Sequence, residues 1–169
     1  MDKKTKRNIA IAVVFLVVLL IEPFWRPLMA TIKGEDATSG STPAGESVVC
    51  TVGVSVQPAL DNIHMMKEES LALLPENGWM LEPVEMTVSE GTTCLEVLQW
   101  ACQEAGIPVV TSGEPPFVEG IGGLNNGDGG DVSGWTYTLN GEQLMVSAAI
   151  QEIQEGDELV YSFVCTWDF

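Results

Sequence analysis

Residues 133–141 read Ser-Gly-Trp-Thr-Tyr-Thr-Leu-Asn-Gly (SGWTYTLNG), and this stretch predicts a β-strand followed by a turn. Trp135, Tyr137 and Leu139 alternate with threonines, so the three apolar side chains share one face of a strand. The Asn-Gly pair that follows is the strongest short-range signal for a tight hairpin turn in the chain. The stretch therefore predicts a half-buried strand that ends in a hairpin.

Further strands are predicted on both sides of this hairpin. Residues 47–56 and residues 158–167 alternate apolar with small or polar side chains over their whole length. Residues 80–89 alternate in the same way, but Pro83 interrupts them. Because proline cannot donate a hydrogen bond to a neighbouring strand, we expect residues 80–89 to form an edge strand.

One amphipathic helix is predicted between these strands. Thr92 or Thr93 supplies an N-cap, Glu96 stands three residues after Thr93, and the helix runs through Glu104 to end at Gly106. A single main helix packed on a mixed sheet predicts an α+β fold, of which a β-grasp-like arrangement is the simplest member. The apolar stripe of the helix consists of Cys94, Leu95, Leu98, Ala101 and Cys102.

Charge divides the chain into two parts. Its 169 residues carry 24 acidic and 7 basic side chains, for a net charge of -17, and six of the seven bases lie within the first 33 residues. Residues 34–169 keep only Lys67 against 22 acids, which leaves a charge of -21. Because so acidic a part repels phosphate groups, nucleic acid is excluded as a partner. A hydrophobic content of 46% is nevertheless sufficient for a folded core.

The N-terminal residues 1–32 predict an export signal or a membrane anchor. Bases precede an unbroken apolar run over residues 9–21, which spans about 20 Å as a helix and is typical of a signal peptide. Bulky Leu28 before the best cleavage site, and the aromatic side chains that follow the run, favour a retained single-pass anchor. We expect residues 33–47 to be a flexible linker. Residues 48–169 then form an extracellular domain at the cell membrane, or a secreted one if the signal is cleaved.

The four cysteines lie in this exported part, where an oxidising environment favours disulfide bonds. Cys94 and Cys102 fall about 12 Å apart on one predicted helix, beyond the ~7 Å that a disulfide spans. The remaining pairings are Cys50–Cys94 with Cys102–Cys165, which we favour, and Cys50–Cys102 with Cys94–Cys165. A metal site is disfavoured because the chain has no CxxC motif and one histidine, His64.

The sequence contains no GxSxG, HExxH, Walker A or GxGxxG motif, so we expect no enzymatic activity and no required cofactor. The loop Asn125–Asp131 gathers oxygen ligands as calcium loops do, but it lacks the EF-hand pattern. We therefore favour a surface loop over a calcium site there.

Three motifs follow one another along residues 117–161. They are FVEGIGGL at residues 117–124, SGWTYTLNG at residues 133–141 and EGDELVY at residues 155–161. Together they resemble the bacterial transcobalamin-like C-terminal domain family. That family is similar to the C-terminal domain of intrinsic factor and transcobalamin, in which a β-rich small domain closes over a corrinoid bound on a helical domain.

The resemblance implies a ligand site between the glycine turn and the aromatic strand. It implies a non-enzymatic, membrane-tethered module at the surface of a Gram-positive cell, with cobalamin or a related corrinoid as ligand. Because the sequence shows no helical partner domain, we expect a partner protein or an uptake permease to complete the site. The alternative is a surface protein–protein interaction domain without small-molecule affinity. The candidate contacts are Gly120, Ile121, Gly122, Gly123, Leu124, Trp135, Tyr137 and Leu139.

Overall fold

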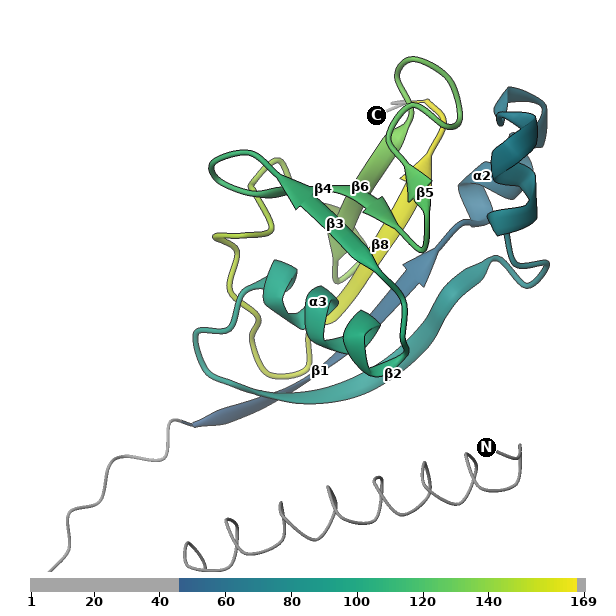
Figure 1. The fold of residues 1–169 in the computed structure, drawn as a ribbon. Helices are drawn as coiled ribbons and strands as arrows, with labels where there is room; N and C mark the ends of the chain where they lie inside the picture. The colour runs from purple at the N-terminus through teal and green to yellow at the C-terminus, as the bar shows by residue number, and fades with distance from the viewer. Residues whose placement is uncertain (1–45, 167–169) are drawn as a thin grey trace, which may run out of the picture. The chain divides into compact units, whose positions relative to one another are not determined.

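The computed structural model describes residues 46–166, so the predicted anchor and almost all of the predicted linker lie outside the described residues. Between residues 46 and 166, no helix is both long and apolar enough to cross a membrane. The elements, shown in Figure 1, are β1 (Ser47–Ser55), α2 (Gln57–Asp61), η2 (Ile63–Met65), η3 (Glu68–Leu73), β2 (Trp79–Ser89), α3 (Cys94–Glu104), β3 (Val109–Ser112), β4 (Phe117–Ile121), β5 (Leu124–Asn125), β6 (Gly134–Leu139), β7 (Glu142–Gln143) and β8 (Glu158–Val164).

A five-stranded mixed sheet organises the domain, with the strand order β2-β1-β8-β6-β7. Strand β1 pairs antiparallel with β2 and parallel with β8, and β8 pairs antiparallel with β6. Strand β2 lies at one edge of the sheet, as the interruption at Pro83 predicts. The last strand lies near the centre of the sheet, and its side chains Leu159, Tyr161 and Phe163 are buried in the core.

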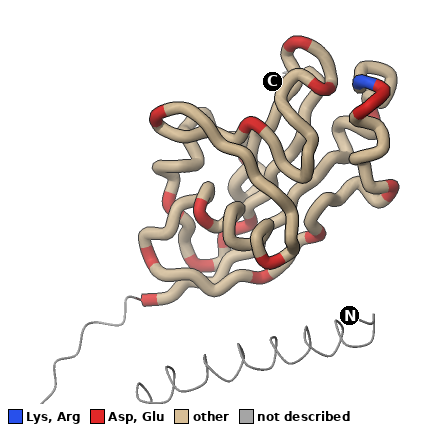
Figure 2. The backbone as a smooth tube through the Cα atoms, in the orientation of Figure 1, with Lys and Arg blue, Asp and Glu red and all other residues tan. Residues whose placement is uncertain are grey.

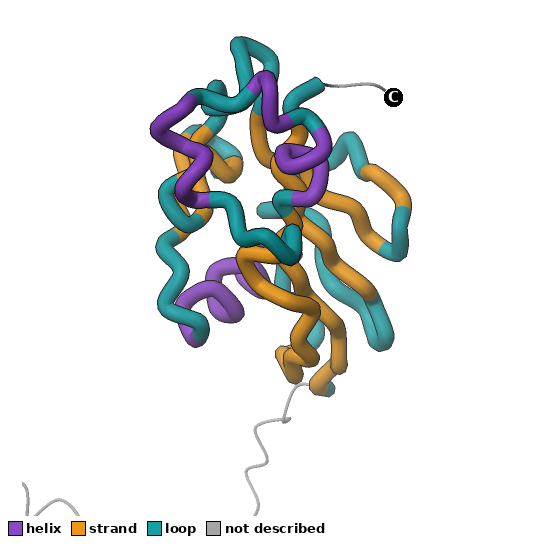
Figure 3. The backbone as a smooth tube through the Cα atoms, turned by 90° about the vertical axis from the view of Figure 1, so that its right-hand side faces the viewer, coloured by secondary structure: helices purple, strands orange, loops and turns teal. Residues whose placement is uncertain are grey.

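A second sheet has three strands, in the order β3-β4-β5. Both of its strand pairs are antiparallel. The short helices α2, η2 and η3 follow the end of β1 in the chain, and Figure 3 shows three helical segments gathered at one end of the domain.

The main helix begins with the capping box that the sequence predicts. The Thr93 hydroxyl accepts a hydrogen bond from the backbone N–H of Glu96 at 3.3 Å, and the Glu96 carboxylate accepts one from the backbone N–H of Thr93 at 2.9 Å. One face of α3 is buried, including Leu95 and Leu98. The predicted α+β fold class, with one main helix against a mixed sheet, is therefore confirmed.

The hairpin after β6 also matches its prediction. Asn140 and Gly141 both have positive φ angles, 55° and 78°, as a tight hairpin turn requires. The Asn140 side chain in addition donates to the Asp157 carboxylate at 2.7 Å and accepts from the backbone N–H of Glu158 at 2.9 Å. The hairpin is thereby tied to the turn that precedes β8.

The four cysteines correct the sequence prediction, because all of them are free thiols in the structure and neither predicted disulfide pairing is present. Each is enclosed by the core, where a thiol packs as a small apolar group. Burial raises the pKa of Cys94 to about 12 and that of Cys102 to about 11. The Cys165 thiol lies 3.7 Å from the sulfur of Met66.

Candidate ligand-binding site

An apolar hollow of about 360 Å³ lies beside β6 and is the best-formed candidate site in the described part of the chain. Its floor comes from β6 and β8, and its walls come from residues 116–118 and residues 143–148. None of the described side chains that line it carries a charge. The volume is near the lower end of the range of about 300–1,000 Å³ that is typical of small-molecule sites.

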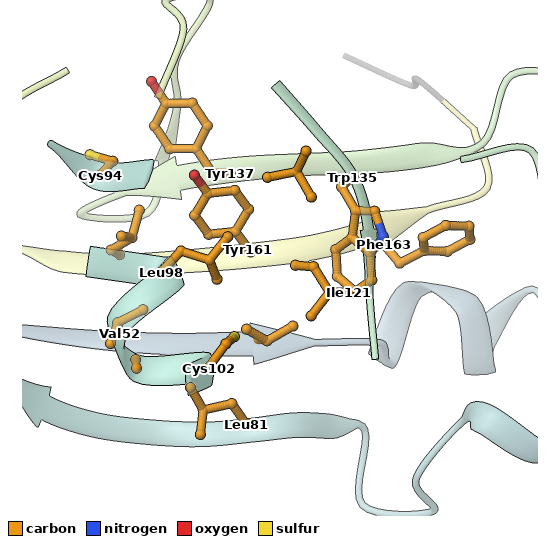
Figure 4. Close-up of a cluster of buried hydrophobic side chains, with 14 of the residues drawn as sticks. Val52, Leu81, Cys94, Leu98, Cys102, Ile121, Trp135, Tyr137, Tyr161 and Phe163 are labelled. Atoms are coloured by element: carbon orange, nitrogen blue, oxygen red, sulfur yellow. The ribbon is translucent and has the colours of Figure 1, made fainter. Parts of the chain in front are cut away.

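Aromatic side chains form the floor. Tyr137 on β6 and Tyr161 on β8 are directly paired across the strands, and their rings stack at 5.7 Å between centroids. Trp135 and Phe163 form the next pair along the same strands, with an edge-to-face contact at 5.3 Å. Figure 4 shows these four side chains on one side of the two strands, with Leu98 of α3 nearby. The alternation predicted from SGWTYTLNG therefore places Trp135 and Tyr137 in the floor of the hollow.

The polar atoms of Trp135 are used within the domain. Its indole nitrogen donates to the carbonyl oxygen of Leu124 at 2.9 Å, and its backbone N–H donates to the Asn126 side chain at 3.0 Å. Trp135 therefore offers the hollow the apolar surface of its ring rather than a hydrogen-bond donor.

The rim of the hollow exposes large apolar side chains. Met145 is 87% exposed, Phe117 is 52% exposed and Val146 is 44% exposed. Grouped exposure of this kind, unlike single exposed apolar residues, is typical of binding surfaces. A ligand that entered the hollow would remove all three side chains from water.

Two neighbouring hollows of about 430 Å³ each share residues with the apolar one. The first shares Trp135 and also contains Asp131. The second shares Leu95 and contains Glu96 and Glu114. Figure 2 shows acidic residues spread over the described chain, with Lys67 as its single basic residue. An uncharged centre is thus flanked by acidic groups.

Only part of the site implied by the resemblance comes together here. Trp135 and Tyr137 line the hollow. Ile121 and Leu124 are fully buried in the core, and Leu139 is half-buried at the core's margin. These last three side chains do not line the hollow.

The glycines of the predicted site also lie elsewhere. Gly122 and Gly123 form the turn between β4 and β5 with φ angles of 61° and 88°. A Cβ atom at Gly122 would come within 3.0 Å of the Met80 sulfur, and one at Gly120 would contact the side-chain oxygen of Asn125. The glycine turn thus packs against other parts of the domain and is not a wall of the hollow.

The wall at residues 143–148 is the part of the site that sequence reasoning missed. The Tyr137 hydroxyl holds this segment by donating to the carbonyl oxygen of Val146 at 2.7 Å. A local signal existed in the pair Met145-Val146, which is apolar although it follows a polar hairpin. Phe117 is the other missed contact, and it directly precedes the buried Val118.

Within residues 46–166, no group of three or more His, Cys, Asp or Glu side chains lies close enough together to hold a metal ion. His64 lies in η2, outside the hollow. In the loop Asn125–Asp131, the Asp128 carboxylate accepts from the backbone N–H of Asn125 at 2.8 Å and pairs with Lys67 at 3.3 Å. This carboxylate therefore serves to hold the loop to the rest of the domain.

Comparison with known proteins supports the family resemblance. The family model described as "Domain of unknown function (DUF4430)" matches residues 91–164. No curated protein matches the chain significantly. The crystal structure of haptocorrin in complex with Cbi is similar, with a TM-score of 0.51 and 16% sequence identity over 80% of this chain and 28% of that one.

A second solved structure is that of a proposed metal-binding protein from Ruminococcus gnavus ATCC 29149. It has a TM-score of 0.43 and 15% identity, and the alignment covers 71% of this chain and 99% of that one. A TM-score at that level does not establish a shared fold. The chain spans little more than a quarter of haptocorrin, and at 16% identity that likeness concerns the fold alone. Residues 46–166 therefore share the fold of part of haptocorrin, which agrees with the transcobalamin-like resemblance that the three sequence motifs carry.

Proposed function

We propose that residues 46–166 form a non-enzymatic binding module that captures a corrinoid, or a similar large ligand with an apolar face, at the hollow beside β6. One observation carries the proposal: an uncharged, aromatic-floored hollow with an exposed apolar rim, in a domain whose surface is otherwise acidic. The fold shared with haptocorrin, whose structure was solved in complex with Cbi, supports the choice of ligand class.

The size of the hollow limits how such a ligand binds. A volume of about 360 Å³ holds one edge of a corrinoid and not the whole macrocycle. The rim side chains Phe117 and Met145 would cover the adjacent face of the ligand. Full burial of a Phe or Met side chain contributes about 1.5–3 kcal/mol, and the loss of translational and rotational freedom offsets much of that gain. The module alone would therefore bind with modest affinity.

A second surface would raise the affinity, and we propose that a partner protein or an uptake permease supplies it. We also propose that the module lies outside the cell and is tethered to the membrane through residues 1–32. Its sheet is proposed to be β-grasp-like. The acidic character of the domain is compatible with this location, because such a surface avoids contact with anionic lipid head groups.

The test is equilibrium dialysis of the full chain, in mild detergent, against cobalamin and cobinamide. Phe117→Ala and Met145→Ala should each weaken binding about five- to tenfold, because each removes apolar area from the contact. Trp100→Ala and Ile63→Ala are the controls, since both are exposed apolar side chains and neither lines the hollow. Equal losses in the controls and in the rim variants would contradict the assignment of the site.

One observation favours the alternative of a protein-docking surface. Exposed apolar side chains continue beyond the hollow, at Val132 on one side and Ile150 on the other. On that alternative the module has no small-molecule affinity. If neither corrinoid binds at concentrations up to about 1 mM, the free energy of binding is weaker than roughly -4 kcal/mol. That result would favour docking over ligand capture.

A further inference from the structure

The hydroxyl group of Tyr161 is buried in the floor of the hollow without a hydrogen-bond partner. It is the one buried side-chain polar atom of this kind among the described residues. Tyr161 is only 2% exposed, and its side chain contributes to the lining of the hollow. Because buried polar groups are almost always paired, an unpaired one points to a missing partner.

The other polar side chains that line the hollow have partners inside the domain. The Tyr137 hydroxyl donates to the carbonyl oxygen of Val146, and the Gln143 amide donates to the hydroxyl of Thr136 at 2.9 Å. The Ser147 hydroxyl reaches the carbonyl oxygen of Pro116 at 3.5 Å. Tyr161 is therefore the lining residue whose hydrogen-bonding capacity is left for a bound molecule.

The position of the hydroxyl suits that role. Tyr161 stacks on Tyr137, and Figure 4 shows the hydroxyl ends of both rings pointing the same way, toward the side of the domain that holds Cys94. The Tyr137 ring stacks on Tyr161 beside the hollow, and its own hydroxyl is engaged by the wall at residues 143–148.

We propose that the hollow recognises an uncharged hydrogen-bond acceptor on its ligand, of the kind a carboxamide oxygen provides, through a hydrogen bond donated by Tyr161. This inference rests on the proposed binding function and specifies the chemical group that enters the hollow. A corrinoid carries such amide groups around its macrocycle, and one of them would enter together with the edge of the ring.

Charge argues for an amide and against a carboxylate. The hollow contains no cation, and the acids Glu96, Glu114 and Asp131 flank it. The single lysine of the described chain already pairs with Asp128. Burial also raises the pKa of Tyr161 well above its ordinary value, so its hydroxyl remains a neutral donor at physiological pH.

The test compares two tyrosine variants of the full chain that each lose one oxygen atom from the same hollow. Tyr161→Phe removes the unpaired hydroxyl, and Tyr137→Phe removes the paired one. Thermal unfolding without ligand should leave Tyr161→Phe at or above the wild-type midpoint, because an unpaired buried polar group is lost. Tyr137→Phe should unfold at a lower temperature, because a made hydrogen bond is lost.

Binding is then measured with cobinamide by equilibrium dialysis, and with acetanilide and isobutylbenzene by ligand-observed NMR. Isobutylbenzene has the shape of acetanilide but no hydrogen-bond acceptor. Tyr161→Phe should weaken the binding of cobinamide and of acetanilide about five- to tenfold, as the loss of one buried hydrogen bond predicts, and should leave isobutylbenzene unaffected.

The outcomes separate this inference from the proposed function. Unchanged cobinamide binding by Tyr161→Phe would overturn the inference while the binding function stands. Tyr161-dependent binding of acetanilide, without binding of cobinamide, would support the inference and reject the corrinoid. Binding of none of the three probes by the wild-type chain would reject both. A Tyr161→Phe variant that unfolds several degrees earlier than wild type would show that the hydroxyl already has a partner, such as a fixed water, and would also overturn the inference.

Discussion

The indole nitrogen of Trp135 lies 2.9 Å from the carbonyl oxygen of Leu124 and donates a hydrogen bond to it. This bond joins two of the motifs that carry the family resemblance, FVEGIGGL and SGWTYTLNG. The resemblance implied that both motifs face a ligand. In the structure the carboxyl end of the first motif, at Leu124, supports Trp135 from behind, while Phe117 and Val118 at its start line the hollow together with the second motif.

Replacement of Trp135 should therefore be costly. Trp135→Phe leaves the buried Leu124 carbonyl without its donor and removes ring volume next to Phe163, so we expect a loss of about 2–4 kcal/mol in the free energy of unfolding. Urea unfolding followed by circular dichroism measures it. Trp100→Phe, at an exposed site on α3, should change the free energy by less than about 0.5 kcal/mol. Similar losses in the two variants would contradict a structural role for the indole bond.

Much of the fold could be predicted from local patterns. The alternation of residues 47–56 and 80–89 corresponds to β1 and β2, and the capping box at Thr93 marks the start of α3 within one residue. The Asn-Gly pair marks the hairpin after β6. In each case neighbouring residues along the chain carry the signal, because strand periodicity, caps and tight turns are local properties.

Non-local packing explains what could not be predicted. No pattern within residues 158–167 indicates that β8 pairs in parallel with β1 and lies inside the sheet. The wall at residues 143–148 is likewise placed by contacts with other elements, from the Tyr137 hydroxyl to Val146 and from the backbone N–H of Leu95 to the carbonyl oxygen of Ala148. The unpaired state of Tyr161 depends on every neighbour it has, so sequence alone could not show it.

The capping box makes part of the stability of α3 dependent on pH. Hydrogen bonds from the backbone and the side chain of Thr93 hold the pKa of Glu96 below its ordinary value. A lowered folded-state pKa stabilises the fold above the unfolded-state pKa of about 4.3, and this contribution is lost as the pH falls through the folded-state value. Thr93→Ala should cost about 1 kcal/mol at pH 7 and less below pH about 4.

Urea unfolding of wild type and Thr93→Ala at several pH values checks this expectation. Glu96→Gln is the control, because glutamine keeps a capping side chain but does not titrate. A difference between wild type and Thr93→Ala that stays constant down to pH about 3 would show that the Glu96 carboxylate has no part in it.

The reactivity of the cysteines distinguishes the four free thiols of the structure from the two disulfide bonds expected in an oxidising compartment. Burial raises the pKa values of all four thiols, those of Cys94 and Cys102 to about 12 and 11, so they should resist iodoacetamide at pH 8 in the folded chain. Unfolding in urea without reductant should then expose four reactive thiols per chain, counted by intact mass. A count of zero would instead support the two disulfides predicted from the sequence.

The acidic surface predicts a response to salt. Lys67 is the single basic residue among many acids in the described chain, so repulsion between carboxylates opposes the folded state at low ionic strength. Raising sodium chloride from about 0.01 M to about 0.15 M shortens the Debye length from roughly 30 Å to roughly 8 Å. The unfolding midpoint of the full chain should rise as a result, which differential scanning calorimetry detects. Lys67→Gln should unfold at a lower temperature at low salt and show a larger rise, because it removes the partner of Asp128 and the single basic side chain within residues 46–166.

The hydroxyl of Tyr137 should control the mobility of the wall at residues 143–148. It donates a hydrogen bond to the carbonyl oxygen of Val146, and this bond ties the exposed Met145-Val146 part of the wall to β6. Tyr137→Phe should lower the free energy of unfolding by about 1 kcal/mol and speed backbone hydrogen exchange within residues 143–148. Exchange in α3 beyond its first turn should be unchanged at conditions where both proteins stay folded, because only the first turn is bonded to the wall, through the N–H of Leu95 and the carbonyl oxygen of Ala148. Tyr161→Phe should leave exchange in the wall at its wild-type rate, since its hydroxyl holds nothing there. Equal acceleration by both variants would mean that loss of either ring oxygen loosens the floor as a whole, and that Val146 is held by the packing of its neighbours and not by Tyr137.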